Sequence, residues 1–344
     1  MKKTRHNIAH ILPGMYFGGV EVAILKSFEQ LNIDFNYEVF FVKGKGKLDS
    51  NQQHVLKLIN RIVRNKYDYD LIVTSLWWGH LIGIFLSLFG MKWACFIHST
   101  GSSSLIDKLV TKIALTKCPN HLFDSESTKD FYKNFKNKKS FVIPYIFEEN
   151  EKDVILKKDV MYDFSWIGRN SEEKRLDLLA KFIRSLKENS FNFECIISIA
   201  GKPYPIIDEL AKESNNNIKV VYDTDPNDII RINYESKMIL CFSNYEGFSV
   251  TTAEAAMRGN LVAARNVGEL GNYLCAQNTL WLDSTDENKW NIFVDRVIEI
   301  LKNDDELYKK RIKSQEFTRA YFLNKNYVKS ISCAFKSLII STHD

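Results

Sequence analysis

The chain has 344 residues, of which 45% are hydrophobic, 13% aromatic and 26% charged. These proportions suit a soluble globular protein of about two domains, and they exclude disordered, collagen-like and low-complexity chains. The net charge of +5 is uneven, because residues 1–150 hold 20 Lys and Arg against 13 Asp and Glu, a net of +7, and the remainder carries −2.

Short apolar stretches alternate with longer amphipathic segments through the first half. The predicted strands are 8–12, 37–42, 70–75, 93–98, 121–124 and 140–144, and the predicted helices are 20–31, 52–66, 105–117 and 127–135. Residues 71–91 contain no Lys, Arg, Asp or Glu, and their length approaches that of a membrane-spanning helix. We interpret them instead as a buried strand, a loop at residues 77–80 and an apolar helix ending near Gly90, all inside a domain.

A second alternation begins after residues 148–159, which are polar and are predicted to form a linker. The predicted strands are 161–167, 195–200, 219–222, 238–242 and 261–264, and the predicted helices are 174–188, 206–213, 225–235, 250–258, 288–302, 304–320 and 326–339. Strands that alternate with helices indicate parallel sheets. The sequence therefore predicts two Rossmann-like domains that face each other across a cleft, with ligands at the carboxyl ends of the strands.

The cysteines show no spacing typical of a zinc site or a disulfide framework. The six residues are Cys95, Cys118, Cys195, Cys241, Cys275 and Cys333, and none forms a Cys-x-x-Cys pair. Several lie within apolar runs, so we interpret them as reduced thiols of a cytoplasmic protein. The basic N-terminus is followed by an apolar run too short for a signal peptide.

Two cations follow a predicted strand in the second half. Gly168 allows a tight turn after the strand, and Arg169 and Lys174 stand five residues apart before a helix begins. A guanidinium can bind phosphate oxygens in a bidentate manner, and a helix N-terminus adds partial positive charge. The segment is either a diphosphate site or an ordinary surface turn.

Two carboxylates stand eight residues apart around a later loop and helix start. Glu246 precedes Gly247, and Glu254 lies in an otherwise apolar helix, where a carboxylate is costly unless it is hydrogen-bonded. Hydroxyl groups of a sugar or a ribose are suitable partners. The alternative is that Glu246 caps the turn and Glu254 pairs with Arg258.

These segments resemble the signature of family 4 retaining glycosyltransferases of the GT-B fold, the type that builds bacterial surface polysaccharides. The resemblance rests on the Glu246-x7-Glu254 segment, the Gly168-Arg169-x4-Lys174 segment, the Gly18-Gly19 loop after the first strand, the Phe96-Ile97-His98 strand end and the Phe141–Pro144 segment. It extends over nearly the whole chain, with all motifs in order. It implies an acceptor-side domain at 1–150, a nucleotide-sugar domain at 151–325 and a C-terminal helix at 326–344 that returns to the first domain.

The resemblance also implies residue roles. Arg169 and Lys174 neutralise the leaving diphosphate, Glu254 binds the ribose, and His98 contacts the donor sugar at the reaction centre. The donor sugar is held by Glu246 with the backbone of Gly247, Phe248 and Ser249, the start of the next helix at Val250 and Thr251 offers N–H groups to phosphate, and Gly18 and Gly19 let the first domain close over the phosphates. Retention by front-face attack requires no protein nucleophile, cofactor or metal.

The sequence departs from the family pattern at two glycine positions. Arg175 follows Lys174 where the family usually has glycine, and it either adds a phosphate contact or faces solvent. Ser249 replaces a common glycine, which affects the preference for the donor sugar. Residues 266–270 are a loose version of a Gly-Gly-x-x-Glu loop, so Glu269 is assigned no role.

The function expected is transfer of a sugar from a nucleotide sugar to a surface-glycan or lipid-linked acceptor. A nucleotide-sugar 2-epimerase of the same fold is the alternative, and a non-catalytic module that binds nucleotides or nucleic acid is a distant third; no nucleic-acid motif is found. Trp77, Trp78 and His80 form either a sugar-stacking wall or part of the core.

A cytoplasmic protein that adheres to the inner membrane face is also expected. Lys108 and Lys112 lie one turn apart on the predicted helix 105–117, and with the basic run 133–139 they are available for an anionic lipid surface. The apolar face of this helix is assigned to core packing. It consists of Leu105, Ile106, Leu109, Val110 and Ile113.

Overall fold

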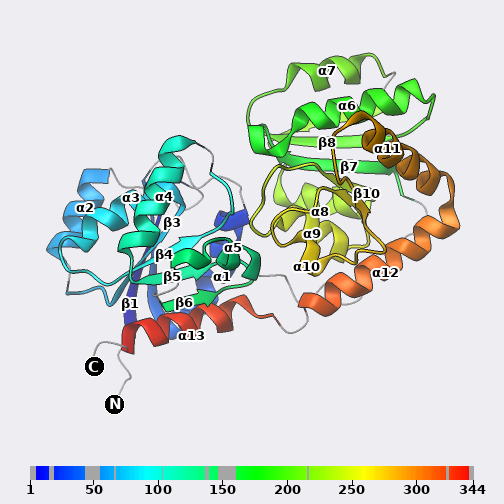
Figure 1. The fold of residues 1–344 in the computed structure, drawn as a ribbon. Helices are drawn as coiled ribbons and strands as arrows, with labels where there is room; N and C mark the ends of the chain where they lie inside the picture. Colours follow the sequence, from blue (N-terminus) through cyan, green and yellow to red (C-terminus); the bar gives the residue numbers. More distant parts are fainter. Residues whose placement is uncertain are drawn as a thin grey trace. The chain divides into compact units, whose positions relative to one another are not determined.

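The computed structural model describes residues 5–14, 19–42, 55–65, 67–102, 104–135, 139–145, 160–214, 217–322 and 325–340. The chain divides into two compact units, of which unit 1 comprises Met1–Ile146 with Lys325–Asp344 and unit 2 comprises Phe147–Asn324. Each unit is an α/β domain built on one six-stranded sheet with helices beside it (Figure 1).

All strand pairs in unit 1 are parallel. The strands are β1 (His6–Leu12), β2 (Phe35–Phe41), β3 (Leu71–Ser75), β4 (Trp93–Ile97), β5 (Asn120–Phe123) and β6 (Lys139–Val142). Their order is β2-β1-β3-β4-β5-β6, so the chain reverses its direction of winding between β1 and β3. Strands β3 and β4 are buried along their whole length, because helices cover both faces of the sheet.

The helices of unit 1 come from both ends of the chain. They are α1 (Gly19–Asp34), α2 (Val55–Arg64), α3 (Leu76–Ser87), α4 (Leu105–Lys117), α5 (Glu126–Phe131) and α13 (Tyr327–Ile340), with a short 3-10 turn at Lys133–Phe135. Helix α13 docks on the first part of the chain, where Phe335 packs against Phe35 and Tyr37. Lys336 also pairs with Asp34 at 2.7 Å.

The loop expected at residues 77–80 is wrong, because these residues form the first turns of α3. Gly79, from the expected loop, and Gly83, from the expected helix, both allow close packing of α3. A Cβ at Gly79 would lie 2.7 Å from the carbonyl oxygen of Ile11, and one at Gly83 would lie 2.4 Å from the Trp93 ring. The spacing of four residues places both glycines on the helix face that contacts the sheet.

The core assignment for the apolar face of α4 is also wrong. Of the five residues assigned to the core, only Val110 is buried, and the buried side of the helix is completed by Thr111, Ala114 and Leu115. Four apolar side chains are exposed, which we call the α4 stripe: Leu105, Ile106, Leu109 and Ile113.

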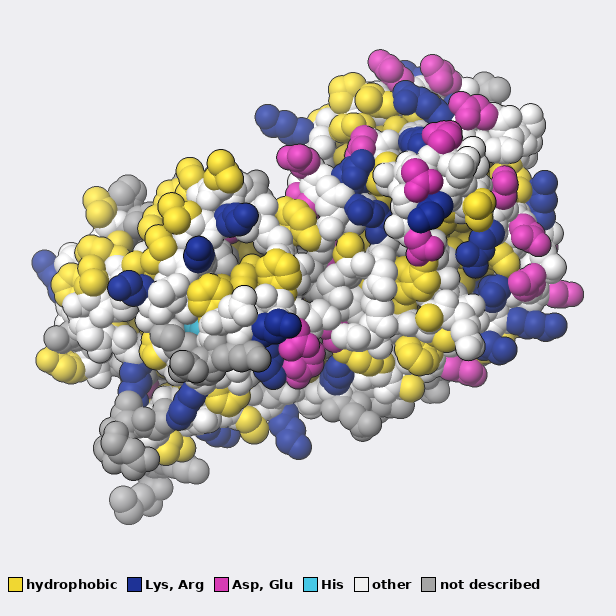
Figure 2. Space-filling model, viewed as in Figure 1, with side chains coloured by type: hydrophobic (Ala, Val, Ile, Leu, Met, Phe, Trp, Pro, Cys, Tyr) yellow, Lys and Arg dark blue, Asp and Glu magenta, His cyan; other side chains and the backbone are white. Residues whose placement is uncertain are grey.

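The run 71–91 is likewise not wholly interior. The outer face of α3 and the turn after it expose four large apolar side chains: Leu81, Phe85, Leu88 and Phe89. In Figure 2, hydrophobic side chains gather over the part of unit 1 where Figure 1 draws α3 and α4, with Lys and Arg side chains among them. Among the described residues, no helix is long and apolar enough to span a membrane.

Unit 2 is also fully parallel, with the strand order β12-β11-β10-β7-β8-β9. The strands are β7 (Tyr162–Arg169), β8 (Cys195–Ala200), β9 (Ile218–Tyr222), β10 (Ser236–Cys241), β11 (Leu261–Ala264) and β12 (Leu280–Trp281). The helices are α6 (Leu176–Glu188), α7 (Pro205–Lys212), α8 (Pro226–Tyr234), α9 (Val250–Met257), α10 (Leu270–Tyr273), α11 (Glu287–Lys302) and α12 (Asp304–Phe322), with a 3-10 turn at Glu172–Lys174.

Aromatic side chains fill the core of unit 2 between the sheet and α6 and α11. Phe182 of α6 contacts Phe164 of β7, and Phe242, directly after β10, contacts Trp290 and Phe293 of α11. This core fixes the central strands β7 and β10, and with them the loops that follow these strands.

Candidate active site

The centre of the site in unit 2 lies where the sheet changes its winding direction. Strand β7 continues to β8 and β9 on one side, and its other neighbour β10 continues to β11 and β12. In open α/β sheets, ligands bind outside the carboxyl ends of the strands at such a switch point. The loops after β7 and β10 meet here, because the Asn244 N–H donates to the Glu173 carbonyl oxygen at 2.8 Å.

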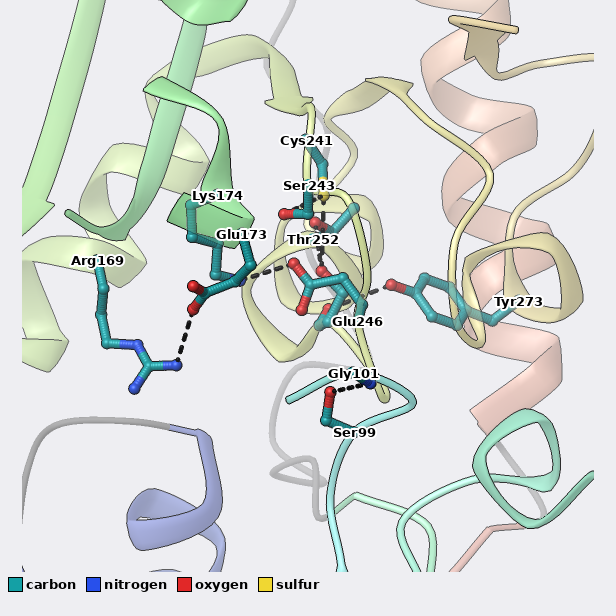
Figure 3. Close-up of polar contacts among 11 residues, drawn as sticks. Ser99, Gly101, Arg169, Glu173, Lys174, Cys241, Ser243, Glu246, Thr252 and Tyr273 are labelled. Atoms are coloured by element: carbon teal, nitrogen blue, oxygen red, sulfur yellow. Dashed lines mark hydrogen bonds and ion pairs between the residues drawn. The ribbon is translucent and has the colours of Figure 1, made fainter. Parts of the chain in front are cut away.

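Lys174 and Glu246 form an ion pair between these two loops (Figure 3). The Lys174 Nζ lies 2.6 Å from the Glu246 Oε1, and the two side chains are only 21% and 10% exposed. Burial, the largest single effect, disfavours the charged ammonium, but the charge and hydrogen bond of Glu246 together with Cys241 outweigh burial and raise the pKa of Lys174. A fixed cation therefore stands at the switch point at neutral pH.

Arg169 lies at the end of β7, close to this pair. Its side chain is 65% exposed, and its guanidinium contacts the Glu173 carboxylate at 3.4 Å. The two cations singled out in the sequence thus differ, since Lys174 is fixed by a buried partner and Arg169 is held loosely. An exposed guanidinium can turn towards a phosphate at little cost.

The loop that follows Glu246 is supported by a second loop, after β11. The Glu269 N–H donates to the Gly247 carbonyl oxygen at 2.9 Å. Gly268 has a φ of +59°, and a Cβ there would lie 2.5 Å from the Gly247 oxygen and 2.6 Å from the Glu246 oxygen. Only glycine allows this contact, so Gly268 sets the position of the loop.

Glu269 is a residue whose role the sequence analysis missed. Its side chain is buried and accepts a hydrogen bond from the Tyr321 hydroxyl of α12. The neighbouring Tyr273 hydroxyl donates to the Ser249 carbonyl oxygen at 3.1 Å. The signal in the sequence is the loose resemblance of residues 266–270 to a Gly-Gly-x-x-Glu loop, in which Glu269 directly follows Gly268, the glycine that supports Gly247.

Helix α9 begins directly after this loop. The side chain of Phe248 is buried against Tyr273 and Phe322, so only its backbone is available to a ligand. Val250 and Thr251 form the first turn of α9, where backbone N–H groups have no partner within the helix. This turn can bind an anionic group next to the Lys174 ammonium.

Glu254 lies one turn further along α9 and is mostly buried. One of its carboxylate oxygens is 3.8 Å from Arg258 Nη1, and the same nitrogen donates to the Glu254 carbonyl oxygen at 3.0 Å. The pairing with Arg258 weighed in the sequence analysis is therefore present, but at 3.8 Å it is beyond hydrogen-bond length.

Replacing Glu254 by glutamine should weaken nucleotide binding more than it lowers thermal stability. The amide keeps the shape of the side chain but accepts hydroxyl hydrogen bonds less strongly than a carboxylate does. Calorimetric titration with nucleoside diphosphates and a melting curve of the same sample measure the two effects. Normal nucleotide binding together with a much lower melting temperature would make Glu254 a structural residue.

Both departures from the family glycines lie at left-handed backbone positions. Arg175 has a φ of 53° and Ser249 a φ of 56°. Side chains rarely adopt this conformation and glycine adopts it freely, which explains the family preference. The Arg175 guanidinium pairs with Asp177 at 2.7 Å and donates to Asn244 Oδ1 at 3.0 Å, so it is tied to this surface rather than free in solvent.

The site residues that the sequence predicts in unit 1 lie on or beside the sheet of that unit. His98 follows β4, its Nε2 lies 3.0 Å from Ser75 Oγ, and its ring packs on Phe96. Burial, with a smaller contribution from His10 and His80, lowers the pKa of His98 well below its usual range, so the ring is neutral. Gly19 is the first residue of α1, and Gly18 lies outside the described residues.

The aromatic pair at the start of α3 is partly exposed. Trp77 and Trp78 are half-buried with ring centroids 4.7 Å apart, whereas His80 is buried and hydrogen-bonded to Thr74. His80 thus belongs to the core.

All six cysteines are free thiols, and no group of three or more His, Cys, Asp or Glu in the described ranges could hold a metal ion.

Residues 147–316 match the family model for glycosyl transferases group 1. This segment is a glycosyltransferase domain. It contains the Lys174–Glu246 pair, the Gly247 loop and α9. No curated protein matches the chain.

Solved structures of low identity share the fold of the whole chain. Sucrose-phosphate synthase from Thermosynechococcus elongatus is 18% identical with a TM-score of 0.77, covering 98% of this chain and 100% of that chain. A glycosyltransferase from Rickettsia africae is 17% identical with a TM-score of 0.71 (99% and 100% covered), and Anabaena HepE, in complex with UDP and glucose, is 13% identical with a TM-score of 0.71 (97% and 99% covered). The two parallel-sheet units, the second of which contains the glycosyltransferase domain, therefore have the GT-B fold.

Proposed function

We propose that the protein is a retaining family 4 glycosyltransferase that moves a hexose from a nucleotide diphosphate to a surface-glycan or lipid-linked acceptor. The observation that carries the proposal is the buried Lys174–Glu246 pair at the switch point of a glycosyltransferase domain. The HepE structure that shares this fold contains UDP and glucose, and a starch synthase structure contains ADP and acarbose, which supports a nucleotide-sugar donor.

The geometry suits stabilisation of a departing diphosphate. When the bond between the anomeric carbon and the phosphate oxygen breaks, its electron pair stays on the diphosphate, and Lys174 and Arg169 offset the new charge. The acceptor hydroxyl oxygen bonds to the anomeric carbon on the same face, and its proton passes to the leaving phosphate oxygen. The bond is exchanged without a protein nucleophile, and the anomeric configuration is retained.

A panel of nucleotide sugars tests this function. Slow release of nucleoside diphosphate should occur with one donor and accelerate when the correct acceptor is added. The product should keep the anomeric configuration of the donor. EDTA should not stop the reaction, since neither Asp-x-Asp sequence, at 68–70 before β3 or at 223–225 after β9, lies in the loops that hold Lys174 and Glu246. Interconversion of a nucleotide sugar with its epimer, without net release of nucleoside diphosphate, would instead identify the protein as a 2-epimerase.

We also propose that unit 1 binds the anionic surface of the inner membrane. The α4 stripe points away from the core, because Leu105, Leu109 and Ile113 follow each other at four-residue intervals on the outer side of the helix. Leu105 is 86% exposed. A helix that is apolar on its outer face as well as its inner face requires a second apolar surface.

The charges beside the α4 stripe favour a membrane as that surface. At 100° per residue, exposed Lys108 and Lys112 lie on one side of the stripe and Lys117 on the other. This is the arrangement of helices that lie in a membrane interface, with apolar side chains among the acyl chains and lysines at the phosphates. Each lysine contributes about 1 kcal/mol near an anionic surface.

Liposome co-sedimentation should show binding to anionic vesicles that falls with added salt and weakens in the double variant Lys108→Glu and Lys112→Glu. Replacing Leu105 and Leu109 by serine should weaken binding without changing the charge. The control with the same charge change is Lys212→Glu and Lys219→Glu in unit 2, which should bind normally. Equal binding to neutral vesicles, or full binding by both sets of variants, would refute the proposal.

A further inference from the structure

Four side chains in unit 1 form a continuous hydrogen-bonded chain that ends at His98. Tyr37 OH lies 2.5 Å from His10 Nδ1, His10 Nε2 lies 2.8 Å from Ser75 Oγ, and Ser75 Oγ lies 3.0 Å from His98 Nε2. We call Tyr37, His10 and Ser75 the relay. It crosses from β2 to β1 and β3, and so spans the point where the sheet of unit 1 changes its winding direction.

The proton positions in the relay follow from Tyr37. Its hydroxyl is buried, and within the described part of the chain its one hydrogen-bond partner is His10 Nδ1. If the hydroxyl accepted this bond, its own proton would be buried without an acceptor, which is costly. Tyr37 therefore donates, and His10 Nδ1 accepts.

The remaining positions are fixed one after another. Burial lowers the pKa of His10 to about 3, with a smaller contribution from His80, so the ring is neutral. A neutral ring that accepts at Nδ1 carries its proton on Nε2, and it donates this proton to Ser75 Oγ. The Ser75 hydroxyl then donates to His98 Nε2, and the neutral His98 ring must carry its proton on Nδ1.

The Ser75 side chain hydrogen bonds within the relay instead of capping its own helix. It occupies the N-cap position of α3, but its side chain makes no cap hydrogen bond. The N-cap residues Ser104 of α4 and Ser125 of α5 both accept a backbone N–H with their hydroxyl oxygens. The residue after Ser75, Leu76, has a φ of 61°, a conformation unfavourable for leucine. The local backbone thus places the Ser75 hydroxyl between two histidines rather than on the helix.

We infer that the relay locks His98 in the neutral tautomer with the proton on Nδ1, so that His98 meets the substrate as a hydrogen-bond donor and not as a cationic acid. Tyr37, His10 and Ser75 are positioning residues that act through His98. None of the described residues hydrogen bonds to His98 Nδ1, which leaves that N–H for an oxygen of the bound sugar. The substrate part of this inference rests on the proposed function, whereas the tautomer does not.

Nuclear magnetic resonance of protein labelled with ¹⁵N-histidine tests the lock directly. Long-range ¹H–¹⁵N correlations distinguish a protonated from an unprotonated ring nitrogen, and loss of the signal in His98→Asn assigns it. The wild-type spectrum should show His98 protonated at Nδ1 from pH 6 to 8. In Ser75→Ala, His98 loses the donor to Nε2, and the two tautomers should mix. Protonation at Nε2 in the wild type, or an unchanged pattern in Ser75→Ala, would overturn the lock.

Kinetics of the same variants test the role of the tautomer. Ser75→Ala should lower kcat about tenfold or more, with a smaller effect on KM, by analogy with the roughly 10–100-fold losses seen when partners that orient metal-binding histidines are removed. Ser104→Ala and Ser125→Ala remove true helix caps and should leave kcat unchanged. Wild-type kcat in a Ser75→Ala variant with mixed tautomers would refute the donor role. A locked tautomer in a protein that transfers no sugar would support the lock and overturn the proposed function.

Discussion

Replacing Lys174 by alanine should lower turnover by about two to three orders of magnitude. The loss of one charge-assisted contact to a leaving group costs about 2.7–4 kcal/mol in the transition state. The variant should also be less stable, because Glu246 would keep a mostly buried carboxylate without its cation. Single-turnover assays at saturating donor separate the chemical step from donor binding.

Arg169→Ala should likewise remove most turnover, but without loss of stability, because its side chain is largely exposed. The control is Lys181→Ala on α6, which removes a partly exposed cation paired with Glu287 on α11. It should retain wild-type turnover. Wild-type turnover in purified, folded Lys174→Ala or Arg169→Ala would contradict the diphosphate assignment.

Gly268→Ala should lower both the stability of unit 2 and the rate of transfer. The new Cβ meets two backbone oxygens below 3.0 Å at a residue with positive φ, so the Gly247 loop must move. Strain at a left-handed residue together with overpacking costs about 2–4 kcal/mol. Urea unfolding measures the stability, and kcat/KM with the best donor measures the effect on the loop.

The Gly201→Ala variant distinguishes the effect of backbone strain from the effect of displacing the Gly247 loop. Gly201 also has a positive φ, of +94°, but a Cβ there would meet no atom within 4 Å. This variant should lose about 1–2 kcal/mol of stability and keep normal kcat/KM. If Gly268→Ala behaves in the same way as Gly201→Ala, the contact with Gly247 does not position the loop.

The alternation of strands and helices was readable in the sequence because parallel strands with both faces covered are continuously apolar. The wrong predictions for α3 and α4 in unit 1 have the same cause, which is that the sequence does not show what packs against each helix. Gly79 suggests a loop in the sequence, yet its missing side chain allows α3 to pack closely on the sheet, which only the neighbouring strand β1 reveals. The α4 stripe was assigned to the core because an apolar periodicity shows that a helix has an apolar face, but not what covers that face.

For the site, too, the sequence predicts individual residues but not how they pair. Lys174 and Glu246 could each be singled out by residue type and local pattern, but their direct pairing across 72 positions depends on the strand order of unit 2. The left-handed backbone at Arg175 and Ser249 was hidden, since neither residue type signals it. The relay was hidden too, because its members lie on three different strands and only their register brings them together.

The docking of α13 on the first strands has a consequence for biosynthesis. Unit 2 is a continuous segment and can complete its core as soon as it leaves the ribosome. Unit 1 cannot complete its core at that stage. Phe335, which packs against Phe35 and Tyr37, is translated after all of unit 2. Tyr37 is the first member of the relay, so the environment of His98 is completed only when α13 docks. Premature termination before α13 would therefore release a chain with a complete unit 2 and an incomplete core around Tyr37.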